Sequence, residues 1–187
     1  MDTGEFWRVV EDARKQAADP ADGEAVAARA TAVLAARPVE EIVAAQQVFW
    51  DLMAQSYRAP LWAAAYLING GCSDDGFDYF RGWLIMQGRE VFEQAVGDPD
   101  ALAELPVVRE AAKDWMEMEC EDALGISWDA YKEATGEEVP QDSFTIRYPE
   151  LDPSWGFDFD DEEERSRRLP RLSALYADRG AGGSTGC

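Results

Sequence analysis

Residues 61–85 read LWAAAYLINGGCSDDGFDYFRGWLI, with an apolar block, a glycine-containing break and a second block rich in acidic and aromatic residues. Its first eight residues are apolar on nearly every side, which predicts a buried helix. Asn69-Gly70-Gly71 ends that helix, because Asn and Gly adopt the left-handed conformation of a helix C-cap at low cost. Ser73 then offers an N-cap for a second helix with acidic residues in its first turn. The stretch therefore predicts two packed helices joined by a short polar loop.

Apolar residues at helical spacing continue on both sides of this stretch. Asp19-Pro20 is expected to start the second helix of the chain, and Ser127 is expected to cap a late one. From 136 to 157 the helical pattern fails, and three prolines predict an extended segment around the helical body, with room for two short strands. We expect one mainly-α domain, a compact helical bundle with this irregular segment. The further helices are expected near residues 6–17, 21–36, 38–57, 106–124, 127–135 and 165–176.

The charge balance excludes several classes of protein. The 187 residues include 38 Asp and Glu against 17 Lys and Arg, with no histidine, for a formal net charge of −21. Such a chain is repelled by a phosphate backbone, so nucleic acid is not an expected partner. Without histidine the chain has no imidazole base and no histidine-ligated metal. Three widely separated cysteines do not form a zinc-site pattern, so we expect no metal and no cofactor.

The amino terminus lacks the basic and apolar regions of a secretory leader. The longest uncharged stretch, residues 59–73, is too short and too interrupted to span a bilayer. We therefore expect a cytoplasmic protein without membrane contact, whose cysteines are free thiols.

The end of the chain differs in kind from the rest. Residues 177–187 are rich in glycine, have no helical periodicity and finish on Cys187. Such a composition is typical of a flexible tail. The expected organisation is a helical domain over residues 1–176 followed by this tail.

Residues 61–85 resemble the signature of the bacterial DUF4240 family. The opening Phe6-Trp7, the later Gln87-Gly88-Arg89 and the ending from Pro170 to Leu172 support the resemblance, which covers about residues 1–176. It implies a small helical domain and brings no established catalytic residues. The tail after Tyr176 is then an addition beyond the usual end of the family.

The densest mixture of polar and aromatic residues runs from Cys72 to Arg81. In a functional interpretation, Asp74, Asp75 and Asp78 are candidate acid or base groups. Cys72, Asp74, Asp75 and Arg81 would then line a ligand pocket between buried helices.

In a structural interpretation, the first two aspartates cap a helix and Arg81 pairs with Asp78 three residues earlier. Arg81 would then stack on Trp83 or Tyr79. As a nucleophile, Cys72 is disfavoured, because neighbouring aspartates oppose a negative sulfur and no histidine serves as base.

Three functional hypotheses follow. We prefer a non-catalytic recognition or scaffold protein whose tail presents Cys187 for modification by a partner enzyme. Such a use of a flexible tail resembles that of carrier proteins and of the peptide precursors of natural-product biosynthesis. The alternatives are an enzyme or small-ligand binder with its pocket at residues 72–81, and an acidic protein that neutralises a basic partner.

Overall fold

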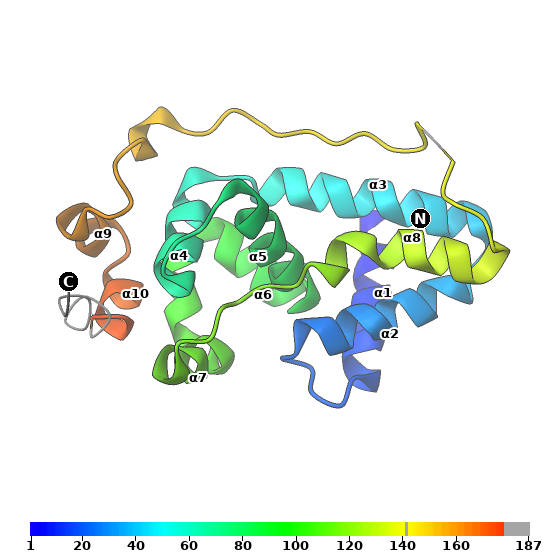
Figure 1. The fold of residues 1–187 in the computed structure, drawn as a ribbon, viewed down its shortest axis with the longest axis horizontal. Coiled ribbons are helices and arrows are strands. Elements are labelled where there is room, and N and C mark those ends of the chain that lie inside the picture. Colours follow the sequence, from blue (N-terminus) through cyan, green and yellow to red (C-terminus); the bar gives the residue numbers. More distant parts are fainter. Residues whose placement is uncertain (141, 178–187) are drawn as a thin grey trace, which may run out of the picture.

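The computed structural model describes residues 1–140 and 142–177, and its regular elements in that part of the chain are all helical. The predicted mainly-α class is confirmed (Figure 1). None of these helices has the length and apolar content that crossing a bilayer requires. The α-helices are α1 (Thr3–Gln16), α2 (Gly23–Ala35), α3 (Val39–Ser56), α4 (Ala59–Asn69), α5 (Asp74–Met86), α6 (Arg89–Gly97), α7 (Pro106–Asp114), α8 (Asp122–Thr135), α9 (Glu162–Arg168) and α10 (Pro170–Leu175), with 3-10 turns η1 (Pro99–Glu104) and η2 (Pro153–Trp155).

The loop between α4 and α5 forms as its sequence predicts. Gly70 ends α4 in the left-handed conformation, with φ of 70°. The Ser73 hydroxyl caps α5 by accepting a hydrogen bond from the Gly76 N–H at 3.1 Å. Both helices are buried along most of their length, because their side chains are apolar or aromatic on several faces.

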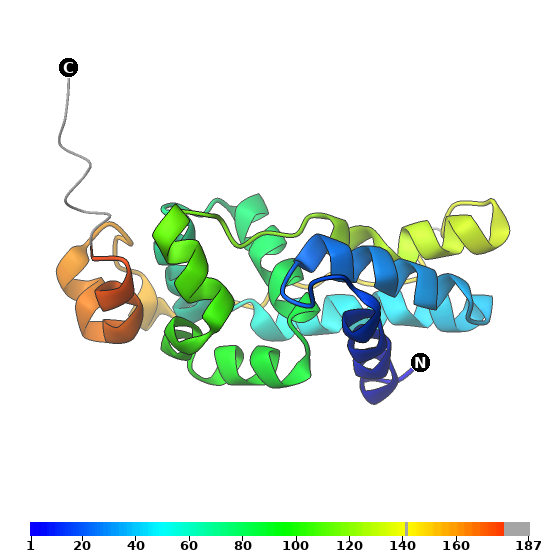
Figure 2. The ribbon, with the colours of Figure 1, turned by 90° about the horizontal axis from the view of Figure 1, so that it is seen from below.

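The core lies where α5 meets the amino-terminal helices. The α2 helix packs against α1 and α8, while α5 contacts α2, α3 and α8. Phe6, Phe49, Phe77 and Phe80 are completely buried there. The α2, α3 and α8 helices form one end of an elongated molecule, and the α9–α10 pair forms the other (Figures 1 and 2).

Charged side chains attach α10 to η1. Arg171 donates hydrogen bonds to the carboxylates of Asp98, Asp100 and Glu104 at distances of 2.5 to 3.0 Å. Asp100 also accepts the backbone N–H groups of Arg171 and Leu172, which satisfies donors at the start of α10. This docking fixes the end of the described chain against the body.

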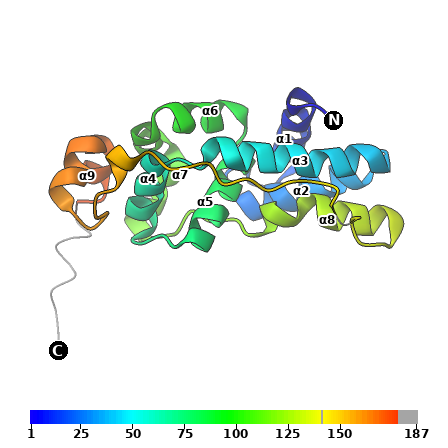
Figure 3. The same cartoon turned by 90° about the horizontal axis from the view of Figure 1, so that it is seen from above.

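An extended strap (residues 142–161) runs along α3 toward α9, as Figures 1 and 3 show. The Gln47 side chain holds it at Thr145, accepting the backbone N–H at 2.8 Å and donating to the carbonyl at 3.2 Å. The two short strands considered for residues 136–157 do not form in the described part of that segment. Its prolines lack backbone donors, and side chains rather than a strand ladder hold it.

Four local predictions are wrong. The single helix expected near 165–176 is interrupted at Leu169 and forms α9 and α10, because Pro170 cannot continue α9. Asp22 rather than Asp19-Pro20 starts the second helix, since the Asp22 carboxylate caps α2 by accepting the Ala25 N–H. The helix expected near 106–124 breaks at Trp115, which has a positive φ of 60°. Ser127 is no cap, because it lies buried inside α8.

Tertiary contacts explain the early break of α7. Residues 116–120 are held in non-helical conformation, with the Met118 N–H donating to the Asn69 side chain at 2.9 Å. The Cys120 N–H donates to the Tyr79 carbonyl at 3.0 Å. These partners lie far away in sequence, so local periodicity could not reveal them.

Candidate functional site

Among the charged residues of 61–85, the stretch that resembles the family signature, Arg81 makes the most side-chain contacts. Its side chain is fully buried on α5. Its Nε donates to the Phe77 carbonyl at 3.2 Å, another guanidinium nitrogen donates to the Met53 carbonyl of α3, and the third pairs with the Asp78 carboxylate. The guanidinium thus binds two backbone carbonyls and a carboxylate at once.

Aromatic rings enclose the same guanidinium. It lies 4.7 Å from the ring centre of Phe77 and 5.0 Å from that of Tyr57. The expected stacking on Trp83 or Tyr79 is therefore wrong. Residues two apart on a helix point to different sides, whereas Phe77 precedes Arg81 by four residues and shares its face.

Asp78 connects this cluster to the strap. One of its carboxylate oxygens binds Arg81, and the other accepts the Tyr148 hydroxyl at 3.0 Å. Burial lowers the pKa of Arg81, and the Asp78 charge opposes that shift. The Arg81 centre is defined by these contacts. Its members are Met53, Tyr57, Phe77, Asp78, Arg81 and Tyr148.

The two described thiols are held in their protonated forms. Burial raises the pKa of Cys72 to about 12, and the Glu119 charge adds to the shift. Burial also raises the pKa of Cys120 to about 12. Burial and the Glu117 charge raise the pKa of Glu119 itself. These environments oppose thiolate formation at either cysteine near neutral pH.

The sequence-predicted site residues separate in the fold. Asp78 and Arg81 join in the Arg81 centre, and Cys72 lies close enough for the Arg81 charge to act on its thiol. Asp74 and Asp75 occupy the first turn of α5 and are exposed to solvent. Cys187, the expected modification site, lies outside the described residues.

A second candidate site lies on the outer face of α5, where this helix packs beside α8. A hollow of about 480 Å³ opens there. We call it the acidic hollow, because five carboxylates line it. Its lining residues are Asp75, Asp78, Tyr79, Glu121, Asp122, Leu124, Gly125 and Asp129.

A close backbone approach positions the two walls of the acidic hollow. Gly82 faces the segment before α8, and a Cβ added to it would lie only 2.7 Å from the Cys120 carbonyl oxygen. Any larger residue there would push that segment away from α5. The Tyr79 hydroxyl then reaches Glu121 at 3.3 Å.

The acidic hollow carries uncompensated negative charge. Within the part of the chain that the structure describes, no Lys or Arg pairs with Asp75, Glu121, Asp122 or Asp129. The charges of Glu121 and Asp75 raise the pKa of Tyr79. No group of three or more Cys, Asp or Glu among residues 1–140 and 142–177 is arranged to hold a metal ion. The unpaired carboxylates of this hollow are acceptors for charge-assisted hydrogen bonds.

The α8 side of the hollow was not predicted from the sequence. Asp122 and Asp129 are separated by seven residues, a spacing that places them on one face of a helix. That spacing was the available signal. It could not reveal that the face lies beside Asp75 and Tyr79, because the packing of α5 on α8 joins distant parts of the sequence.

The fold and its charges define an acidic, mainly helical protein with a buried arginine at its centre. The chain belongs to the DUF4240 family, whose model, described as a protein of unknown function, matches residues 1–133. No curated protein and no solved structure matches the chain. The match includes residues 61–85 and nearly all of α8, and it ends before the strap. That the family domain extends to residue 176 therefore stays a prediction.

Proposed function

We propose that this chain is a non-catalytic recognition protein that binds a basic partner protein through the acidic hollow. The observation that carries the proposal is that four of the five carboxylates lining the hollow, those of Asp75, Glu121, Asp122 and Asp129, have no ion pair in the described chain. The net charge of −21 would steer a cationic partner toward it.

The lining of the hollow suits a lysine or arginine side chain. Asp75, Asp122 and Asp129 offer carboxylate acceptors for charge-assisted hydrogen bonds. Tyr79 offers an aromatic ring against which a guanidinium can stack. By contrast, the hydrogen-bonding groups of the Arg81 centre are directed at one another, which favours a structural role for that cluster.

The test is a titration of the full chain with a labelled oligoarginine peptide at low and at raised salt. The double variant Asp122→Asn/Asp129→Asn should weaken binding by about tenfold or more. The control Glu40→Gln/Glu90→Gln removes the same charge from two exposed first-turn residues outside the hollow, and should change binding far less. Equal losses in both double variants would reduce the effect to general charge attraction and contradict the proposal.

The second element of the proposal is the tail over residues 177–187, with Cys187 presented to a partner enzyme for modification. The high pKa values of Cys72 and Cys120 support it, because they leave Cys187 as the thiol available for chemistry near neutral pH. The proposal places the protein in the cytoplasm, where thiols stay reduced.

Intact mass of the protein from its native host, with mapping of the carboxy-terminal peptide, tests this element. An added group or cleavage confined to residues 180–187 would support it. In the purified chain, Cys187 should also be alkylated faster than Cys72 and Cys120. A tail that stays unmodified across growth conditions would contradict the carrier-like role and leave recognition by the hollow to stand alone.

A further inference from the structure

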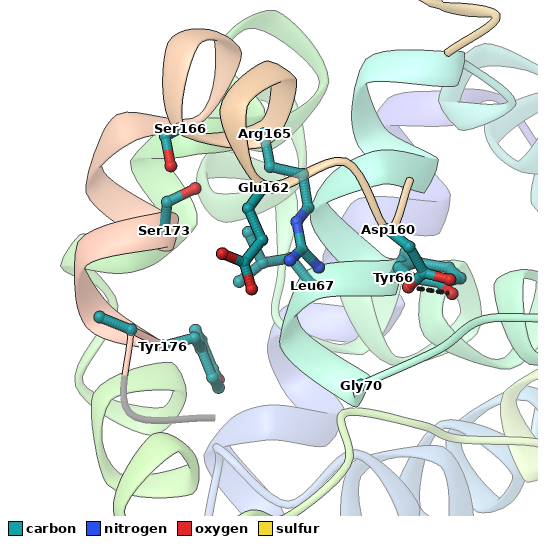
Figure 4. A pocket seen from close by; sticks show the side chains of 10 residues that line it. Tyr66, Leu67, Gly70, Asp160, Glu162, Arg165, Ser166, Ser173 and Tyr176 are labelled. Carbon is teal, nitrogen blue, oxygen red and sulfur yellow. Dashed lines mark hydrogen bonds between the residues drawn. The ribbon is translucent and has the colours of Figure 1, made fainter. Parts of the chain in front are cut away.

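A separate pocket lies between α4 and the α9–α10 pair, with a volume of about 520 Å³ (Figure 4). It differs from the acidic hollow because its wall contains a cation, Arg165, beside two carboxylates and several hydroxyl groups. We call it the α4–α9 pocket. Its polar lining includes Tyr66, Asp160, Glu162, Arg165, Ser166 and Ser173, with Tyr176 beside them.

The guanidinium of Arg165 is the distinctive group of this pocket. Its neighbours on α9, Arg167 and Arg168, both bind Glu164. Within the described chain, the Arg165 side chain makes no such hydrogen bond or ion pair. Figure 4 shows Arg165 and Glu162 extending side by side into the hollow. A half-buried guanidinium without a hydrogen bond or ion pair in the described chain can accept a ligand carboxylate as its counter-charge.

A second polar group in the pocket lacks a partner. The Ser173 hydroxyl oxygen is shielded from solvent and forms no hydrogen bond among the described residues. A buried hydroxyl without a partner costs free energy, so a rotation of the Ser173 side chain that brings its hydroxyl to a ligand atom in the hollow is favoured. In Figure 4 the Ser173 and Ser166 hydroxyls point toward each other on the same side of the hollow.

The charges of the wall select the kind of ligand. Asp160 and Glu162 outnumber Arg165 in a chain of net charge −21, so a phosphate or another multiple anion would be repelled. A simple cation would leave Arg165 without a counter-charge. A ligand that carries both signs satisfies Arg165 and Glu162 together. Asp160 is already held at the wall by the Tyr66 hydroxyl, at 2.8 Å.

We propose that the α4–α9 pocket binds a small zwitterion of the amino-acid class, a free α-amino acid or a dipeptide. The ligand carboxylate binds Arg165, the ammonium group binds Glu162, and the serine hydroxyls complete the polar contacts. The volume lies within the range of ordinary small-molecule sites. This site is independent of recognition by the acidic hollow, which other residues line.

Calorimetric titration of the full chain with the standard amino acids and a set of dipeptides tests the proposal. At least one of them should bind saturably. Acetate and methylammonium, which each carry one half of the zwitterion, should bind far more weakly. Arg165→Gln should weaken binding of the zwitterion by about tenfold or more, and Glu162→Gln should also weaken it.

The matched control is Arg29→Gln, which removes an exposed α2 cation that has no ion pair in the described chain and lies outside the pocket lining. It should leave binding unchanged, and thermal unfolding should confirm that all variants fold. Failure of every amino acid and dipeptide to bind would overturn the proposal. Binding that survives both pocket substitutions, or acetate that binds as tightly as the zwitterion, would overturn it too.

Discussion

The Arg81 centre and the acidic hollow are both built on α5, yet their charged groups differ in one respect. In the Arg81 centre the guanidinium is surrounded by a carboxylate, two carbonyls and two aromatic rings. In the acidic hollow the carboxylates of α8 face solvent without a cation. Asp78 belongs to both. Polar residues that pair with one another therefore indicate a structural role, whereas the unpaired carboxylates of the hollow are the ones we propose as a binding surface.

The largest predicted effect comes from breaking the internal pair. Asp78→Asn leaves the Arg81 guanidinium buried without its counter-charge, and should lower the free energy of unfolding by about 3–5 kcal/mol. Chemical denaturation measures it. Asp75→Asn, one turn earlier on α5 and on the exposed side, should change stability by only about 0.5 kcal/mol. Equal effects at the two positions would remove the distinction between the two regions.

The next effect concerns the contact that holds the two walls of the hollow. Gly82→Ala places a methyl group against the Cys120 carbonyl and should destabilise the fold by about 1–3 kcal/mol. Gly125→Ala is the control, because its Cβ would meet only the Asp129 carboxylate, at 3.5 Å. Thermal unfolding distinguishes them. A Gly82→Ala protein as stable as the Gly125→Ala protein would contradict the close approach of α5.

A smaller effect is expected where the strap meets the Arg81 centre. Tyr148→Phe removes the hydrogen bond to Asp78 and should cost about 0.5–1.5 kcal/mol. It should also speed proteolytic cleavage within the strap. Tyr79→Phe, which removes a longer bond to Glu121 on the exposed hollow side, should leave both measurements nearly unchanged. Unaltered cleavage in Tyr148→Phe would show that the strap is held by other contacts.

The smallest predicted effect is a local dependence on pH. Hydrogen bonds from Arg167 and Arg168 lower the pKa of Glu164 from 4.5 to about 2. Because the folded-state pKa is depressed, these contacts contribute fully above pH 4.5 and are lost as the pH falls toward 2. Carboxyl chemical shifts from NMR should place the Glu164 midpoint well below those of the exposed acids. A midpoint near 4.5 would contradict these ion pairs.

The capping preferences of neighbouring residues were sufficient to predict the helices of residues 61–85. Gly70 and Ser73 determine the end of α4 and the start of α5 through backbone conformation and capping, which depend on near neighbours. The Asp78–Arg81 pair was predictable for the same reason. The break after Asp114 was not, since the Asn69 side chain competes with the helix for Met118. The hollow also escaped prediction, because its walls come from two helices that are far apart in the sequence and meet only in the folded chain.

The most direct test of recognition by the hollow is a map of backbone amide shifts in the full chain as oligoarginine is added. The largest changes should fall on Tyr79, Glu121, Gly125 and Asp129, and amides around the buried Arg81 should move little. Changes spread evenly over the acidic surface, or centred on another helix, would contradict the claim that this protein recognises a basic partner through the face between α5 and α8.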